Sequence, residues 1–176
     1  RTGDRRSGME ELEAGLALAD SARLPMERTD LLVMKAEFLF ADEANEEALR
    51  FLHDAQRMAE RTGYARGLCM VRINLGNFRY AQERWDDAWQ DYQAALGLAT
   101  AGGFDLLAES CANNLGAVAA SSGRFDLALH LFDSLAHTLG DQRLSFKAAL
   151  LGQIGYIQDM KGDHERALEL FHRAIA

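Results

Sequence analysis

The chain has 176 residues, of which 48% are hydrophobic and 26% are charged, with a single proline. This composition is that of a folded, helix-rich protein and excludes a disordered chain. The formal net charge of −8 argues against a nucleic-acid-binding surface, because such surfaces use Lys and Arg to displace counterions from phosphates. No apolar run approaches the roughly 20 residues that a membrane-spanning helix needs.

The first residues predict that the chain opens at a turn between two helices. Residues 3–8 begin with Gly-Asp and have the spacing of residues 162–167, which follow a helical run later in the chain. Residues 9 to about 23 then form a second helix without its first, and Pro25 ends it because a helix interior cannot keep a residue that lacks an N–H. With no initiator Met and no signal peptide, the sequence is expected to be a piece of a longer protein.

Four further helix pairs are predicted from apolar residues that recur three and four positions apart, and no stretch has the alternation of a strand. Short loops make neighbouring helices antiparallel. We expect an all-α fold of about nine helices in one domain, residues 1–176. The expected helices after the first are at about 27–41, 46–63, 66–82, 84–100, 106–121, 124–139, 142–160 and 164–176. The corresponding repeats are approximately 1–24 (partial), 27–63, 66–103, 106–140 and 142–176.

The last three pairs share one set of residues at one spacing. A glycine in the first helix is followed twelve residues later by an alanine in the second, and four residues after that by an aromatic residue. The glycine lets the partner helix approach closely, the alanine is the small facing residue, and the aromatic ring is expected to fill the wedge between adjacent repeats. One such pair cannot bury its apolar face alone, so the repeat predicts a stacked solenoid. The sets are Gly76, Ala88 and Tyr92; Gly116, Ala128 and Phe132; Gly155, Ala167 and Phe171; and, more weakly, Ala36, Ala48 and Leu52.

These residues resemble the tetratricopeptide repeat (TPR) family, whose pattern pairs Leu-Gly in the first helix with Ala-x-x-x-Phe in the second. Leu115-Gly116 with Ala128 and Phe132 carries the resemblance best. It implies a right-handed superhelical α-solenoid with a concave groove lined by the first helix of each pair. The chain departs from the family in its period, 39 or 40 residues instead of about 34. It also lacks the usual tyrosine three residues after the glycine, where it has Arg79, Ala119 and Gln158. HEAT repeats share the period but not the glycine-to-alanine spacing, and are a distant alternative.

One face of each first helix is the candidate binding surface. The residues two before, one after and four after the small residue share this face, and the resemblance implies that its Asn residues hold an extended or helical segment of a partner. Carboxamides donate and accept hydrogen bonds, so a row of them suits a peptide backbone. Alternatively, Asn74 and Asn114 only cross-link neighbouring helices and the tyrosines only pack. The candidate binding residues are Met34, Glu37, Asn74, Asn77, Tyr80, Asn113, Asn114, Gln153 and Tyr156.

Chemically reactive residues form no catalytic or metal-binding pattern. The five histidines fall on second helices without the cysteine or carboxylate spacing of a metal site, and neither a nucleophile–base arrangement nor a phosphate-binding loop is found. We therefore expect no enzyme, no cofactor and no metal. The groove face has no Lys or Arg, so the basic clamp by which chaperone-binding TPR proteins hold a C-terminal carboxylate is not expected. Cys69 and Cys111 are expected to be buried thiols in the reducing cytoplasm.

The function most consistent with these features is a non-enzymatic protein-interaction scaffold that binds a peptide or helical segment in its groove. The alternative is a sensor or oligomerisation arm of a larger bacterial-type transcription or signalling regulator, which binds a small ligand or self-associates. The expected partner is a protein or peptide, and neither nucleic acid nor a membrane is expected to bind this segment. A homodimer through exposed repeat ends is also expected, because terminal repeats need a polar cap.

Overall fold

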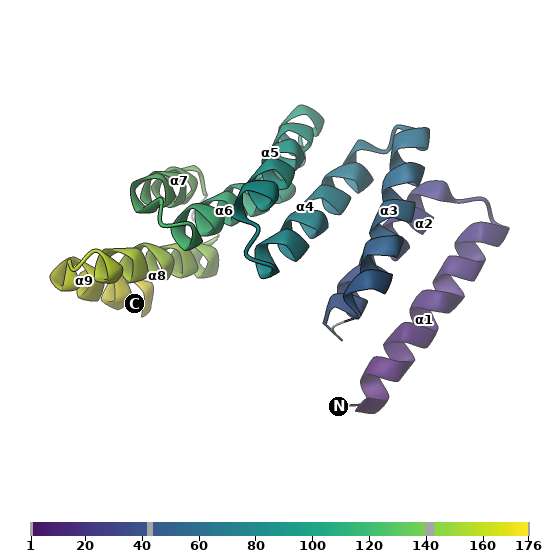
Figure 1. The fold of residues 1–176 in the computed structure, drawn as a ribbon, viewed down its shortest axis with the longest axis horizontal. Coiled ribbons are helices and arrows are strands. Elements are labelled where there is room, and N and C mark those ends of the chain that lie inside the picture. Colours follow the sequence, from purple (N-terminus) through teal and green to yellow (C-terminus); the bar gives the residue numbers. More distant parts are fainter. Residues whose placement is uncertain (1, 42–43, 140–142, 176) are drawn as a thin grey trace. The chain divides into compact units, whose positions relative to one another are not determined.

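The computed structural model describes residues 2–41, 44–139 and 143–175, which contain nine α-helices and no strand (Figure 1). The all-α prediction is therefore confirmed for these residues. The predicted helix end at Gly140, the start near Gln142 and part of the turn after Ala41 fall outside them. The helices are α1 (Thr2–Ser21), α2 (Pro25–Phe40), α3 (Asn45–Thr62), α4 (Ala65–Ala81), α5 (Trp85–Gly102), α6 (Asp105–Ser121), α7 (Phe125–Thr138), α8 (Leu144–Met160) and α9 (His164–Ile175).

The chain divides into two compact units, residues 1–108 and 109–176. In the first unit, each of α1 to α4 packs against the next helix, and the two first helices α2 and α4 also touch. In the second unit, α8 packs against both α7 and α9. A hydrophobic core cluster lies in the first unit and joins α2, α3 and α4. It consists of Leu32, Val33, Ala36, Leu39, Ala48, Leu52, Ala55, Val71 and Leu75.

The beginning of the chain corrects two predictions. The helix α1 starts at Thr2, so residues 3–8 are helical and are not a turn. Charged and polar pairs four residues apart, such as Arg6 with Glu10, support the helix there. Pro25 is the first residue of α2 and does not end the preceding helix, because the first turn of a helix tolerates a missing N–H.

The predicted repeat register nevertheless extends to α1. Gly63 and Gly103, each fifteen residues after the small alanine of a second helix, end α3 and α5 in the left-handed conformation. Arg23, fifteen residues after Gly8, takes the same conformation with a φ of 57°. Gly8 therefore occupies the alanine position of a second helix, as the spacing predicts, although the turn expected before it is replaced by helix.

The spacing of sixteen residues between glycine and aromatic residue, which recurs in the last three helix pairs, corresponds to a direct contact. A Cβ atom built on Gly116 would lie 2.4 Å from a ring carbon of Phe132, and one on Gly76 would lie 2.6 Å from a ring carbon of Tyr92. The same atom on Gly155 would lie 2.8 Å from Phe171. Each ring therefore lies against the glycine of its own helix pair, whereas the sequence predicts rings between adjacent repeats. The glycine makes room for the ring.

The arginine that replaces the family tyrosine has a partner inside the first unit. Arg79 and Arg72, two turns apart on α4, both bind the carboxylate of Asp91 on α5, at 2.6 Å and 3.1 Å between nitrogen and oxygen. Asp91 is only 2% exposed. Burial raises the pKa of Asp91 above the ordinary value of an aspartate, although Arg79 and Arg72 act in the opposite direction. The departure from the family pattern is thus one part of a three-residue ion cluster around the buried carboxylate of Asp91.

Candidate functional site

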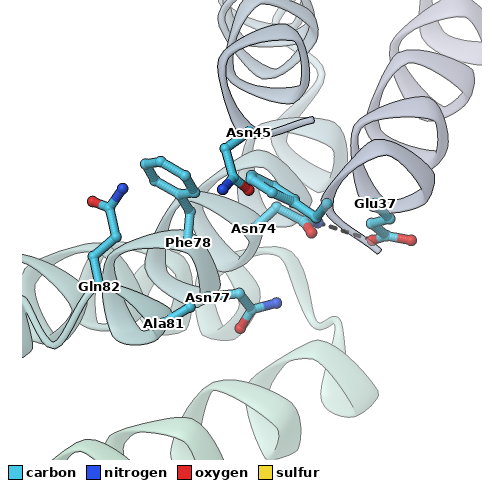
Figure 2. Close-up of a pocket in the computed structure, with 8 residues that line it drawn as sticks. Glu37, Asn45, Asn74, Asn77, Phe78, Ala81 and Gln82 are labelled. Atoms are coloured by element: carbon cyan, nitrogen blue, oxygen red, sulfur yellow. Dashed lines mark hydrogen bonds between the residues drawn. The ribbon is translucent and has the colours of Figure 1, made fainter. Parts of the chain in front are cut away.

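A cavity of about 330 Å³ lies between α2 and α4 in the first unit, at the end of both helices that faces the start of α3. Three of the predicted binding residues, Glu37, Asn74 and Asn77, meet here. Figure 2 shows the side chains of Asn45, Asn74, Asn77 and Gln82 around it. The cavity is lined by Glu37, Phe40, Asn45, Asn74, Asn77, Phe78, Ala81 and Gln82.

Two phenylalanines form the apolar part of the cavity. The rings of Phe40 on α2 and Phe78 on α4 stack with their centroids 5.2 Å apart and their planes 29° apart. Both side chains are only partly buried, so the stacked pair keeps apolar area exposed to the cavity. An aromatic pair in an otherwise polar site is a typical anchor for an apolar side chain of a partner.

Asn74 links the two helices beneath the cavity. Its Nδ2 donates to Oε1 of Glu37 at 2.9 Å and to the backbone oxygen of Met70 at 3.1 Å, and the residue is 5% exposed. The first of these bonds is the dashed line in Figure 2. This is the cross-linking role that the alternative interpretation expects. Asn74 thereby fixes the carboxylate of Glu37, which is exposed and lines the cavity.

The side chains of Asn77 and Tyr80 also make contacts with α5 in the first unit. The hydroxyl of Tyr92 donates to Oδ1 of Asn77 at 2.7 Å, so the ring that covers Gly76 also positions an amide of the cavity. Tyr80 packs edge-on against Trp85 with centroids 5.1 Å apart, and it does not line the cavity. Packing is therefore the role that the structure shows for Tyr80.

The remaining predicted residues lie away from this cavity. Met34 on α2 is 49% exposed and is not part of its lining. Asn113, Asn114, Gln153 and Tyr156 belong to the second unit. There, a side-chain hydrogen bond joins the first helices α6 and α8, since Nε2 of Gln153 donates to Oδ1 of Asn113 at 3.2 Å. Tyr156 is 60% exposed.

The cavity includes residues that the sequence does not single out, namely Asn45, Phe78, Ala81 and Gln82. A signal for them exists in the spacing on α4. Residues 74, 78 and 82 are four apart and therefore share a face, and residues 77 and 81 are related in the same way. The face of α4 that lines the cavity therefore extends beyond the predicted residues, towards the end of the helix.

The antiparallel helix pairs, with an aromatic ring on a glycine in each of the last three, define a helical repeat protein. The tetratricopeptide repeat family model matches residues 67–136, which confirms the resemblance over α4 to α7. This segment of the chain is similar to tetratricopeptide repeats. No curated protein sequence matches the chain.

Solved structures show the same fold over nearly the whole chain. BtubC (BKLC) from P. vanneervenii is 18% identical, with a TM-score of 0.82 over 98% of this chain and 72% of that protein. A kinesin light chain with TPR-like repeats from Podospora anserina is 14% identical, with a TM-score of 0.72 over 98% and 86%. The Rap conjugation gene regulator of plasmid pLS20, solved with the Phr* peptide, is 16% identical, with a TM-score of 0.68 over 92% and 50%. This chain therefore spans about half of the Rap regulator.

The described residues contain neither a membrane-spanning helix nor a cluster of metal-binding side chains. No helix there is both long and apolar enough to cross a membrane. No three His, Cys, Asp or Glu side chains in that part of the chain are grouped so that they could hold a metal ion. Cys69 and Cys111 are both buried, as predicted, and Sγ of Cys69 donates to the backbone oxygen of Ala95 at 3.3 Å.

Proposed function

We propose that the chain is a non-enzymatic peptide-binding module, and that the cavity between α2 and α4 receives a segment of a partner protein. The observation that carries this proposal is the combination in one cavity of stacked aromatic rings with four carboxamides and a carboxylate. The rings accept an apolar side chain of the peptide. The amides of Asn45, Asn77 and Gln82 bond to its backbone, because each carboxamide both donates and accepts.

The charge of the cavity defines the kind of peptide. Glu37 brings a carboxylate, and the described residues that line the cavity include no Lys or Arg. The site therefore favours backbone N–H groups or a Lys or Arg side chain next to the apolar anchor, and it disfavours a peptide's terminal carboxylate.

The comparison with the Rap regulator supports the alternative of a regulatory arm. That protein is solved in complex with a peptide, and this chain has the fold of about half of it. A peptide-binding repeat segment could therefore serve as the sensor of a longer regulator. The interaction scaffold and the regulatory arm share the peptide site. They differ in the effect of peptide binding, because a regulatory arm changes its self-association when the peptide binds. Sedimentation of the chain with and without bound peptide distinguishes them.

Peptides selected from a displayed random library against this chain provide the test of the site. We expect the selected peptides to carry an apolar residue beside a basic one. Phe78→Ala and Glu37→Gln are each expected to weaken binding about tenfold or more, as for anchors at the centre of an interface. Fluorescence anisotropy of labelled peptides measures the change.

Met34→Ala is the matched control for these substitutions. Met34 lies three residues before Glu37 on α2 and is exposed, but it does not line the cavity. Its removal should leave affinity unchanged within about twofold. Equal affinity of the selected peptides for the parent chain, Phe78→Ala and Glu37→Gln would show that they bind elsewhere, and the proposed site would be wrong.

A further inference from the structure

A further cavity, of about 250 Å³, lies in the first unit at the turn between α1 and α2, against the end of α3. It lies at the opposite end of α2 from the peptide cavity, and the two cavities share no lining residue. Three guanidinium groups face one carboxylate there, in a chain whose net charge is −8. The charged lining residues are Asp20, Arg23, Arg28 and Arg61, and the apolar wall includes Leu24 and Met58.

One of the three cations has a counter-charge within the described part of the chain. Nε of Arg28 lies 2.5 Å from Oδ1 of Asp20. The side chains of Arg23 and Arg61 are exposed, and within residues 2–41, 44–139 and 143–175 neither side chain forms an ion pair or a hydrogen bond. The cavity therefore has two positive charges that its one carboxylate does not balance.

The guanidinium group of Arg28 keeps donors for a ligand. The side chain is 29% exposed, and its buried Nε lies beside Asp20 without the geometry of a hydrogen bond. Nη1 donates to Sδ of Met58 at 3.9 Å. A thioether sulfur is a weak acceptor, whereas a guanidinium group has several N–H donors in a fixed plane. An anionic oxygen in the cavity would satisfy donors that the chain itself leaves poorly bonded.

The three arginines are not a feature of the repeat. The turn between α3 and α4 has the same register forty residues later, and it holds Gly63, Leu68 and Ala101 at the corresponding positions. Arg23 has a left-handed backbone with a φ of 57°, a conformation that side chains disfavour and that Gly63 shares. The packing of the repeat therefore does not require an arginine at any of these positions.

We propose that this cavity binds a phosphate monoester. Such a group carries a charge of about −1.5 to −2 at neutral pH, which matches the two unbalanced positive charges. Guanidinium groups bind phosphate oxygens through paired, charge-assisted hydrogen bonds. The phosphate lies among Arg23, Arg28 and Arg61, and the organic group next to it lies against Leu24 and Met58.

Phenyl phosphate is the probe for this site, and benzoate is the singly charged comparison. In a chain labelled at its methionine methyl groups, phenyl phosphate is expected to shift the signal of Met58 in a saturable way, with a dissociation constant of about 1 mM or lower. Benzoate should bind about tenfold more weakly or worse, because it carries one charge. The double variant Arg23→Gly/Arg61→Ala has the residues of the next turn, so circular dichroism should show a parent-like fold. Its affinity for phenyl phosphate should fall about tenfold or more.

A small metabolite and a phosphorylated side chain present the same phosphate group, and two more probes separate these sources. Tighter binding of glycerol phosphate supports a metabolite, and tighter binding of a short peptide with one phosphoserine supports a phosphorylated partner. Glycerol and the unphosphorylated peptide should give no saturable shift of Met58. Shifts equal to those of the phosphorylated forms would contradict a phosphate site.

Arg50→Ala/Arg57→Ala is the control for charge removal, since both arginines are exposed on α3 and neither lines the cavity. Its affinity for phenyl phosphate should stay within about twofold of that of the parent chain. The proposal is overturned if phenyl phosphate gives no saturable shift, if benzoate binds as tightly, or if Arg23→Gly/Arg61→Ala binds as the parent does. An equal loss of affinity in both double variants would also overturn it, because the effect would then follow net charge alone.

Discussion

Replacement of both arginines that hold Asp91, as Arg72→Leu/Arg79→Leu, is expected to destabilise the first unit by about 3–5 kcal/mol. The reason is that Asp91 is almost fully buried and would keep its carboxylate without a compensating charge. Removal of one side of a buried ion pair leaves the cost of taking the other charge out of water. Unfolding in urea at neutral pH, followed by circular dichroism, measures the loss.

The triple variant Arg72→Leu/Arg79→Leu/Asp91→Leu is expected to recover the parent stability or exceed it by about 1–4 kcal/mol. The chain itself contains the precedent, since the corresponding positions of the α2–α3 pair are all apolar. Leu32 and Leu39 there are buried core residues. A triple variant as unstable as the double variant would show that the cluster contributes net stability and that this interpretation is wrong.

Because the pKa of Asp91 is raised, the difference in stability between the parent chain and the triple variant should depend on pH. Burial raises the pKa in the folded chain above its unfolded value. The contribution of this group to stability is therefore fully present below the unfolded pKa, and it is lost as the pH rises through the folded value. From about pH 4 to neutral pH, the parent chain should lose free energy of unfolding relative to the triple variant.

Gly116→Ala is expected to destabilise the second unit by about 1–2 kcal/mol. Its new methyl group would lie 2.4 Å from the ring of Phe132, which is 1% exposed and cannot move aside easily. Overpacking of this kind costs about 1–3 kcal/mol or more, whereas the higher helix propensity of alanine contributes at most about 1 kcal/mol in the other direction. Thermal unfolding compared with the parent chain measures the net effect.

Two further variants separate the steric cause from helix propensity. Gly152→Ala also replaces a glycine inside a helix of the second unit, but nothing lies within 4 Å of the new methyl group, so it should stabilise by up to about 1 kcal/mol. Gly116→Ala/Phe132→Leu reproduces the natural pair Ala36 and Leu52, both core residues, and should recover part of the loss. If Gly116→Ala and Gly152→Ala both stabilise the chain, the ring does not require the glycine.

Most of the fold could be predicted because the repeat fixes a register. Trp85, Phe125 and His164, nine residues after the three glycines, are the first residues of α5, α7 and α9. The prediction failed at residues 3–8, where a Gly-Asp pair was matched to a turn by its residue types and by its spacing to Gly8. A glycine followed by aspartate breaks a helix only when the surrounding residues do not support one, and here they do.

Only part of the site could be predicted. The sequence prediction took the residues two before, one after and four after the small residue, which describe one face of a single helix. Three of the predicted residues, Glu37, Asn74 and Asn77, line the cavity. The prediction missed Phe78 because the stacking of Phe78 on Phe40 depends on how closely α4 packs against α2. The hydrogen bonds of Asn74 to Glu37 and to its own helix agree with the alternative interpretation, in which Asn74 cross-links neighbouring helices.

Photo-crosslinking tests the central claim, that a partner peptide lies in the cavity between α2 and α4, most directly. Ala81 lines the cavity and is exposed, and Gln90 on α5 is exposed and does not line it. A benzoylphenylalanine placed at position 81 should crosslink to the library-selected peptides, and the same group at position 90 should not. Crosslinking from position 90 together with none from position 81 would contradict the account.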